Sequence, residues 1–169
     1  MNEKQVDTNY LTRLFIAPLF GIVALVWILL LVVSYPFRFA YEQWLKFRFW
    51  LRHGRHGRFV LLVYSDSPNW KPYIESKILP RLGSGVVTLN WSARKEWKRS
   101  NRFEAKLFNH WAGDNEFNPM ALVFDPIGKV KDVRFWQAFR DFKHGKDRLL
   151  KQAENVLFSE VERIVGRSA

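Results

Sequence analysis

The sequence predicts an α/β domain that follows a single apolar helix. Residues 14–37 carry no charged side chain, which is the pattern of a membrane-spanning helix. Further along, short apolar runs alternate with segments of helical spacing, as expected for a sheet covered by helices. The chain has 169 residues, enough for one ordinary domain beyond the apolar stretch and too few for two.

Composition limits the function classes. The 27 lysines and arginines outnumber the 16 acidic residues and give a net charge of +11, which favours anionic partners such as phospholipid headgroups or nucleic acid. Cysteine is absent, and this excludes disulfides, thiolate metal sites, cysteine nucleophiles and dithiol redox chemistry. The four histidines lack metal-ligand spacing, so we expect no metal and no cofactor.

The uncharged stretch predicts a transmembrane helix over residues 14–37, preceded by a short tail, residues 1–13. A helix of that length measures roughly 36 Å, against roughly 30 Å of hydrocarbon. The apolar core of a signal peptide is usually about 7–15 residues long, and no small-residue cleavage site follows. We therefore expect an uncleaved, single-pass anchor.

The charges on either side of this helix predict its orientation. On the N-terminal side, Lys4 and Arg13 are diluted by Glu3 and Asp7. Because the cation-rich flank stays in the cytoplasm, we expect the N-terminus outside and the C-terminal domain at the cytoplasmic face of the cell (inner) membrane. The opposite orientation would place six cations on the translocated side. These six are Arg38, Lys46, Arg48, Arg52, Arg55 and Arg58.

Residues 38–57 interleave aromatic and basic side chains. At helical spacing one face of this segment is apolar and mostly aromatic, which predicts an interfacial helix with its rings and cations at headgroup depth. The residues of this face are Phe37, Ala40, Tyr41, Trp44, Phe47 and Leu51. The alternatives are a stop-transfer flank with a Gly54–Gly57 hinge, or a nucleic-acid-binding arm. The predicted membrane-interface residues are Arg38, Trp44, Lys46, Arg48, Trp50, Arg52 and Arg55.

Residues 58–169 form the predicted soluble domain, with the element order βαβαββα. Near-continuous apolar runs predict buried strands, and runs with helical spacing between Ser or Pro starts and Gly ends predict helices. The last two strands pair as a hairpin around a D-P-I-G turn. The expected elements are a strand at 59–65, a helix at 69–82, strands at 86–90, 120–125 and 129–135, and helices at 93–111 and 149–164.

Two segments resemble the thioredoxin fold. NPMALVFDPIGKV (residues 118–130) is similar to the segment in which a cis-proline precedes a central strand and a D-x-x-G-K turn follows. FVLLVYSDSPNWKPYIESKILPRL (residues 59–82) is similar to the strand and helix that usually carry the C-x-x-C pair. In this chain S-P-N-W stands at the position of the two thiols, so the redox activities of the family are not implied.

The same resemblance leaves an enzyme as an alternative. Some thioredoxin-fold glutathione transferases use a serine or tyrosine at this turn, which would assign thiol binding to Ser67 or Ser65 and tripeptide binding to Pro119. Those enzymes also have a helical second domain, for which this chain lacks the residues. The simpler interpretation is that Ser67 caps the helix. Asp66 and Asp125 follow strands that run in opposite directions in this fold, so we expect them at opposite ends of the sheet.

Cations repeat along the predicted helix at 93–111. The four-residue spacing predicts a continuous basic stripe, in which like charges repel each other by a few tenths of a kcal/mol per pair. Such a stripe is either a solvated helix face or a docking surface for lipid phosphates, an acidic protein or RNA. The predicted anion- or partner-binding residues are Arg94, Lys95, Lys98, Arg99, Arg102 and Lys106.

These observations predict a membrane-anchored, non-redox, thioredoxin-like binding or scaffold protein. The expected partners are an anionic bilayer and a protein at the membrane. The alternatives are a glutathione transferase-like enzyme that uses the Ser67 turn, and a membrane-tethered binder of nucleic acid, for which the sequence has no dedicated signature.

Overall fold

The computed structural model describes residues 8–113, 117–126 and 129–168, without the side chains of residues 8–18, Lys98 and Ser168. The chain divides into two compact units, Met1–Trp44 and Leu45–Ala169; we call the second the C-terminal domain. The helices are α1 (Thr8–Arg52), η1 (Gly54–His56), α2 (Lys71–Tyr73), η2 (Ile74–Ile78), α3 (Leu79–Leu82), η3 (Gly83–Gly85), η4 (Trp91–Ala93), α4 (Arg94–Ser100), α5 (Phe103–Ala112), α6 (Trp136–Lys143) and α7 (Arg148–Ser168). The strands are β1 (Val60–Tyr64), β2 (Val86–Asn90), β3 (Met120–Val123) and β4 (Lys131–Arg134).

The first unit is the apolar part of α1. Its side chains from Leu19 to Ala40 are exposed, because nothing within this unit packs against a single helix. By length and composition the helix can cross a membrane, a property that it shares with signal sequences. Near its end, Tyr41 and Trp44 stack with ring centroids 5.9 Å apart.

The C-terminal domain begins earlier than expected. The same helix continues to Arg52, and on its last turns Leu45 and Phe49 are buried, at 0% and 1% exposure. The Phe49 ring stacks on Phe124 with centroids 3.8 Å apart. The second compact unit therefore begins at Leu45, whereas the sequence predicts a domain boundary at residue 58 and a juxtamembrane segment over residues 38–57. The helix contributes to the core because Leu45, Phe49 and His53 recur every four residues and form a second face. This face lies beside the aromatic face, which remains exposed.

The strands form one mixed sheet with the order β2-β1-β3-β4. β1 and β2 are parallel, whereas β3 is antiparallel to both β1 and β4. This confirms the α/β class and the β3–β4 hairpin; Ile127 and Gly128 of the expected turn lie outside the described residues. The register pairs Val60 with Val123 and Val63 with Met120, so Asp66 and Asp125 follow opposite ends of the sheet, as expected.

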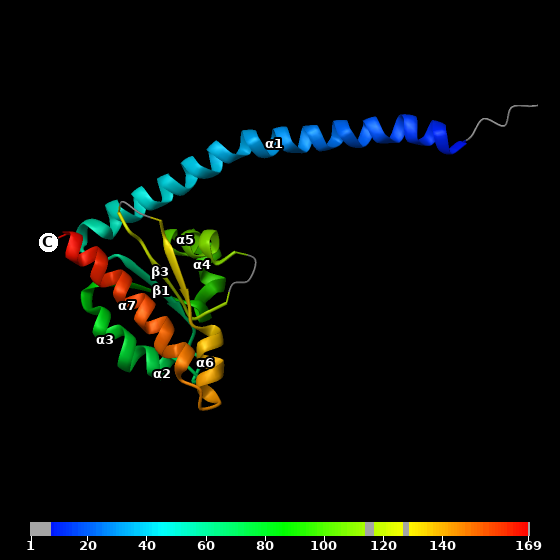
Figure 1. Ribbon diagram of the computed structural model, residues 1–169. Helices are drawn as coiled ribbons and strands as arrows, with labels where there is room; N and C mark the ends of the chain where they lie inside the picture. The colour runs from blue at the N-terminus through cyan, green and yellow to red at the C-terminus, as the bar shows by residue number, and fades with distance from the viewer. Residues whose placement is uncertain (1–7, 114–116, 127–128, 169) are drawn as a thin grey trace, which may run out of the picture. The chain divides into compact units, whose positions relative to one another are not determined.

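Helices cover both faces of the sheet. Successive residues of β1 alternate between two cores, with Leu62 in one and Leu61 in the other, as the two-residue period of a strand requires. The first core is closed by α3, α6 and α7, and the second by α4, α5 and the end of α1. Figure 1 shows α7 beside α2 and α3, with α4 and α5 across the sheet.

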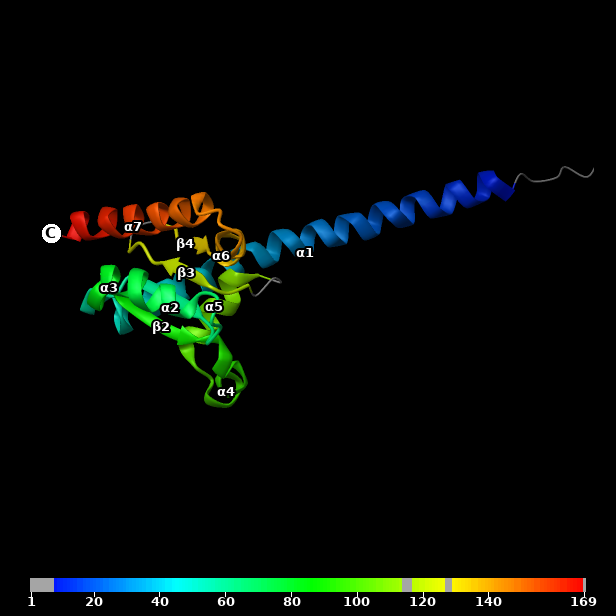
Figure 2. The same ribbon diagram turned by 90° about the horizontal axis from the view of Figure 1, so that it is seen from below.

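The expected helix over residues 93–111 is broken in two. Asn101 lies between α4 and α5 with a left-handed φ of 47°, a conformation that asparagine tolerates better than most residues. Its backbone N–H donates to the Trp97 carbonyl and ends α4. In Figure 2, α4 projects from the domain and α5 returns toward the sheet. The break lets α5 direct Phe103, Leu107 and other apolar residues into the core.

Two other helical segments differ from expectation. The segment predicted at 69–82 is helical from Lys71, and its middle, η2, is a π-helical turn. The helix α6 was not predicted, because residues 134–144 show only a mixture of aromatic and basic side chains. It buries Ala138 and Phe139 in the first core.

Candidate functional site

The turn between β1 and α2 holds the serines that the resemblance assigned to thiol binding. The Ser65 hydroxyl accepts a hydrogen bond from Trp70 Nε1 at 3.2 Å. The Ser67 hydroxyl accepts the backbone N–H of Asn69 at 3.3 Å, the bond of a serine that stabilises its own turn. Both hydroxyls therefore have structural partners within the turn.

The neighbouring Asp66 is also part of this turn. Its carboxylate accepts hydrogen bonds from Asn90 Nδ2 at 2.9 Å and from Lys71 Nζ at 2.7 Å. Its backbone N–H donates to Ser92 Oγ at 3.0 Å. The Asn90 bond and then the Lys71 bond lower the pKa of Asp66. Asp66 therefore joins the ends of β1 and β2 as an ionised acceptor.

Pro119 lies at the same end of the central strands. It immediately precedes β3, whose Met120 pairs with Val63 of β1, and the Asn118–Pro119 peptide bond is cis, as the resemblance implies. Pro119 is buried, and the adjacent Asn118 Oδ1 is buried without a hydrogen-bond partner among the described residues. The antiparallel pairing of β1 and β3 thus brings Pro119 and the Ser65–Ser67 turn to the same end of the sheet.

The predicted membrane-interface residues separate into two groups. Trp44 and Trp50 are 45% and 43% exposed, and Arg38 and Arg55 are also exposed, whereas Lys46 is half-buried. The other two, Arg48 and Arg52, lie over the Phe103 ring of α5 at 5.0 and 6.0 Å. These two arginines therefore pack on α5 within the C-terminal domain.

A buried polar contact joins His53, which directly follows α1, to Glu104 of α5. His53 and Glu104 are 9% and 4% exposed, and His53 Nε2 lies 2.9 Å from Glu104 Oε1. Arg52 and Arg102 approach the same carboxylate at 3.5 and 3.6 Å. Burial acts to raise the pKa of Glu104, but its own backbone N–H, His53 and Arg52 outweigh burial and hold the pKa below its usual value. Sequence reasoning missed this contact, which links residues 51 positions apart.

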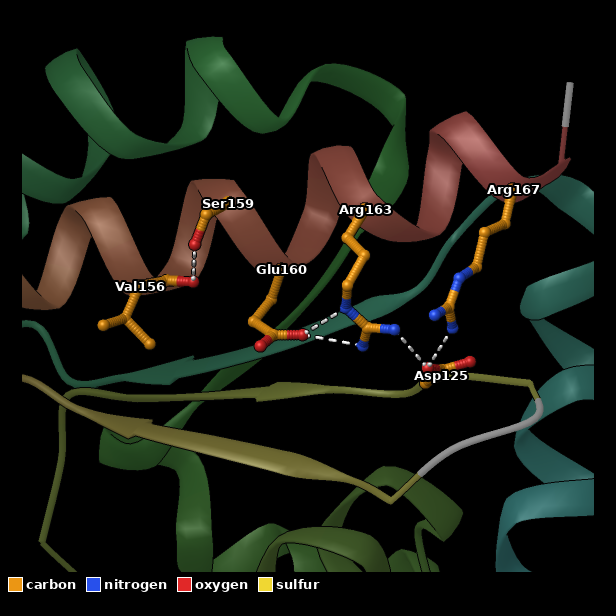
Figure 3. A network of polar contacts seen from close by, with 6 residues as sticks. All are labelled: Asp125, Val156, Ser159, Glu160, Arg163 and Arg167. Carbon is orange, nitrogen blue, oxygen red and sulfur yellow. Dashed lines mark hydrogen bonds and ion pairs between the residues drawn. The ribbon is translucent and has the colours of Figure 1, made fainter.

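A second network fixes α7 to the end of β3. The carboxylate of Asp125, a 6% exposed residue, accepts a hydrogen bond from Arg163 Nη1 at 2.9 Å, and Arg167 Nη1 lies 3.5 Å away. Arg163 also contacts Glu160 at 2.7 Å. Figure 3 shows both arginines reaching down from α7 to Asp125. Asp125 therefore has a structural role in addition to its place in the expected turn.

The predicted basic stripe becomes a pocket rather than a line of charges. Because the chain turns at Asn101, cations from α4, from α5 and from the turn between them line a cavity of about 360 Å³, which we call the cationic pocket. Its cationic lining residues are Arg94, Lys95, Arg102 and Lys106. The other lining residues are Trp91, Trp97, Asn101, Ala105 and Asn109.

The other two predicted cations are Arg99 and Lys98. Arg99 is exposed on α4 and is not among the lining residues. The Lys98 side chain lies outside the described part of the chain. The two tryptophans and two asparagines of the pocket were missed by sequence reasoning. Their only sequence signal is that they interrupt an otherwise basic segment.

Aromatic rings make the wall of the cationic pocket. The Trp91 ring meets Trp97 and Phe108 edge to face, with centroids 5.7 and 5.4 Å apart. The Arg94 guanidinium lies 5.2 Å from the Trp91 centroid, within the range of a cation–π interaction. Trp97 is 6% exposed, and its Nε1 has no hydrogen-bond partner among the described residues.

Compared with known proteins, the chain matches no family model, no curated protein and no solved structure. Within the described residues, no group of three or more histidine, aspartate or glutamate side chains could hold a metal ion. The arrangement that remains is a cationic pocket in an α/β domain whose first helix includes a candidate membrane span.

Proposed function

We propose that this chain is a membrane-anchored, non-redox binding or scaffold protein, whose C-terminal domain has a thioredoxin-like fold and holds a partner at the membrane. One observation carries the proposal. The helix α1 contains the candidate span and, in its last turns, the core residues Leu45 and Phe49. The same helix therefore supplies both the candidate membrane anchor and part of the domain core.

Three features support the thioredoxin-like part of the proposal. The sheet order is β2-β1-β3-β4 with β3 antiparallel to β1, the arrangement expected of a βαβ unit followed by a ββα unit. A cis-proline precedes β3. The turn after β1 begins a helical segment, although the two thiols of the redox proteins are replaced, since the chain has no cysteine.

The hydrogen bonds in the turn after β1 favour a binding function over a catalytic one. The Ser65 and Ser67 hydroxyls accept bonds from Trp70 and Asn69, and the cationic pocket is built by α4 and α5 instead. The positively charged C-terminal flank of the span favours a cytoplasmic domain. We therefore assign the partner-holding role to the cationic surface, with the domain on the inner face of the cell membrane.

The proposal is tested by membrane extraction and crosslinking of the full chain. We expect the protein to stay with the membrane at alkaline pH, to require detergent for release, and to crosslink to a defined partner in native membranes. Release into the aqueous fraction without detergent would contradict the anchor. Conjugation of glutathione to an electrophile by the purified chain, with loss of that activity in Ser67→Ala, would replace the proposal with the transferase alternative.

A further inference from the structure

We propose that the cationic pocket binds a phosphate monoester, carried either by a lipid headgroup or by a small soluble ester. The inference deepens the proposed function and rests on it, because it names the chemistry that the partner-holding surface recognises.

The charge of the pocket is unbalanced. Its nine described lining residues include four cations and no acid. Some cations elsewhere on the domain pair with carboxylates, as Lys71 does with Asp66 and Arg134 with Asp132. Among the described residues, no carboxylate lies within 4.0 Å of Lys95 or Lys106, and Arg102 shares Glu104 with Arg52 and His53. A ligand with more than one negative charge would relieve the mutual repulsion of these cations.

A phosphate monoester matches this lining better than a carboxylate does. It carries about −1.5 to −2 charges at pH 7 and three strong acceptor oxygens, whereas a carboxylate carries one charge. Arg94 and Arg102 can each donate two parallel hydrogen bonds to its oxygens, and the lysines add point charges. The side-chain amides of Asn101 and Asn109 are further donors in the lining.

The aromatic wall indicates that the ligand also has an uncharged part. A volume of about 360 Å³ is at the lower end of the range of small-molecule sites, and is larger than a bare phosphate needs. Trp91 is held by Trp97, Phe108 and Arg94, so this surface is already ordered. We therefore expect glycerol or a similar short carbon skeleton to lie against Trp91, with the phosphate toward Lys95 and Lys106.

The test is calorimetric titration of the full chain in a neutral detergent with two probes, glycerol 3-phosphate and short-chain phosphatidic acid in mixed micelles. We expect saturable binding. Lys95→Gln and Lys106→Gln each remove one charged donor from the pocket, and each should weaken binding about tenfold. Arg99→Gln is the matched control, because it removes one exposed charge from α4 without altering the lining; it should change affinity less than about twofold.

The outcomes distinguish a lipid from a soluble phosphate ester, and they test the pocket separately from the proposed membrane-anchored function. Equal binding of both probes assigns the site to soluble esters, and binding of phosphatidic acid alone assigns it to lipid. Absence of saturable binding, or an equal loss in Arg99→Gln and Lys106→Gln, overturns the pocket. Membrane extraction and partner crosslinking of the same samples test the proposed function separately. If the pocket does not bind a phosphate ester, these measurements still show whether the chain is anchored and has a partner. All three substituted side chains are exposed at the surface, and circular dichroism checks that the variants fold.

Discussion

Phe49→Ala tests whether the last turns of α1 belong to the domain core. The Phe49 side chain is 1% exposed, stacks on Phe124 and lies 5.1 Å from the His53 ring. Phe47, two residues earlier on the same helix, is 57% exposed. The two phenylalanines therefore form a matched pair that differs in burial and not in residue type or element.

The expected cost follows from these contacts. Truncation of a buried phenylalanine to alanine lowers the free energy of unfolding by about 3–5 kcal/mol, because transfer energy is lost and a cavity remains. The stacked pair with Phe124 accounts for about 0.5–1.5 kcal/mol of this. Phe47→Ala should change the free energy of unfolding by less than about 0.5 kcal/mol, as exposed substitutions usually do.

The assay is urea unfolding of the full chain in a non-denaturing detergent, followed by near-ultraviolet circular dichroism. If Phe49→Ala prevents folding, Phe49→Leu provides a milder variant with an expected loss of roughly 1–2 kcal/mol. Equal stability losses in the Phe47 and Phe49 variants would refute the assignment of residues 45–52 to the core. They would restore the interpretation of this segment as a linker.

Three other outcomes are expected. The pKa of Glu104 is lowered in the folded protein, so the ionised carboxylate contributes fully to stability above the usual glutamate pKa of about 4.5, and this contribution is lost as the pH falls below that value. Glu104→Gln should lower the free energy of unfolding by about 1–2 kcal/mol at pH 7. Urea unfolding at a series of pH values should then show a smaller loss of stability in acid for this variant. Arg163→Leu should lower the melting temperature more than Glu160→Gln, because only the first removes the 2.9 Å bond to buried Asp125; calorimetry that ranked them in reverse would contradict the network in Figure 3. Because the chain has no cysteine, Ser159→Cys supplies a single thiol on the exposed surface of α7, and a membrane-impermeant maleimide should label it only after the cells are lysed; labelling of intact cells would reverse the proposed topology.

Much of the domain could be predicted because its signals are local. The four strands follow from short apolar runs, and the hairpin follows from the turn residues between two of them. The helix at 93–111 was mistaken for a single element because Asn101 is only a weak helix breaker, although it adopts a left-handed conformation that ends α4. The helix α6 was missed for the opposite reason, since its buried residues, Ala138 and Phe139, are too few to show a period.

The candidate site was harder to predict than the fold. Its cations were found from their four-residue spacing, but that spacing implied a stripe on a straight helix. The turn at Asn101 converts the stripe into a pocket, adds Trp91 and Trp97 to its lining, and leaves Arg99 outside. A turn in the chain changes which side chains lie close together, and such a turn cannot be predicted from composition.

The sequence by itself determined the chemistry of this protein. A charge-free stretch can cross a membrane, a chain without cysteine cannot perform thiol chemistry, and excess lysine and arginine attract anions; these properties belong to residue types whatever their positions in space. Only the tertiary structure decided that Leu45 and Phe49 belong to the core, that His53 pairs with Glu104, and that cations of α4 and α5 surround one cavity. Each of those depends on residues meeting across a folded chain, where packing and burial determine the contacts.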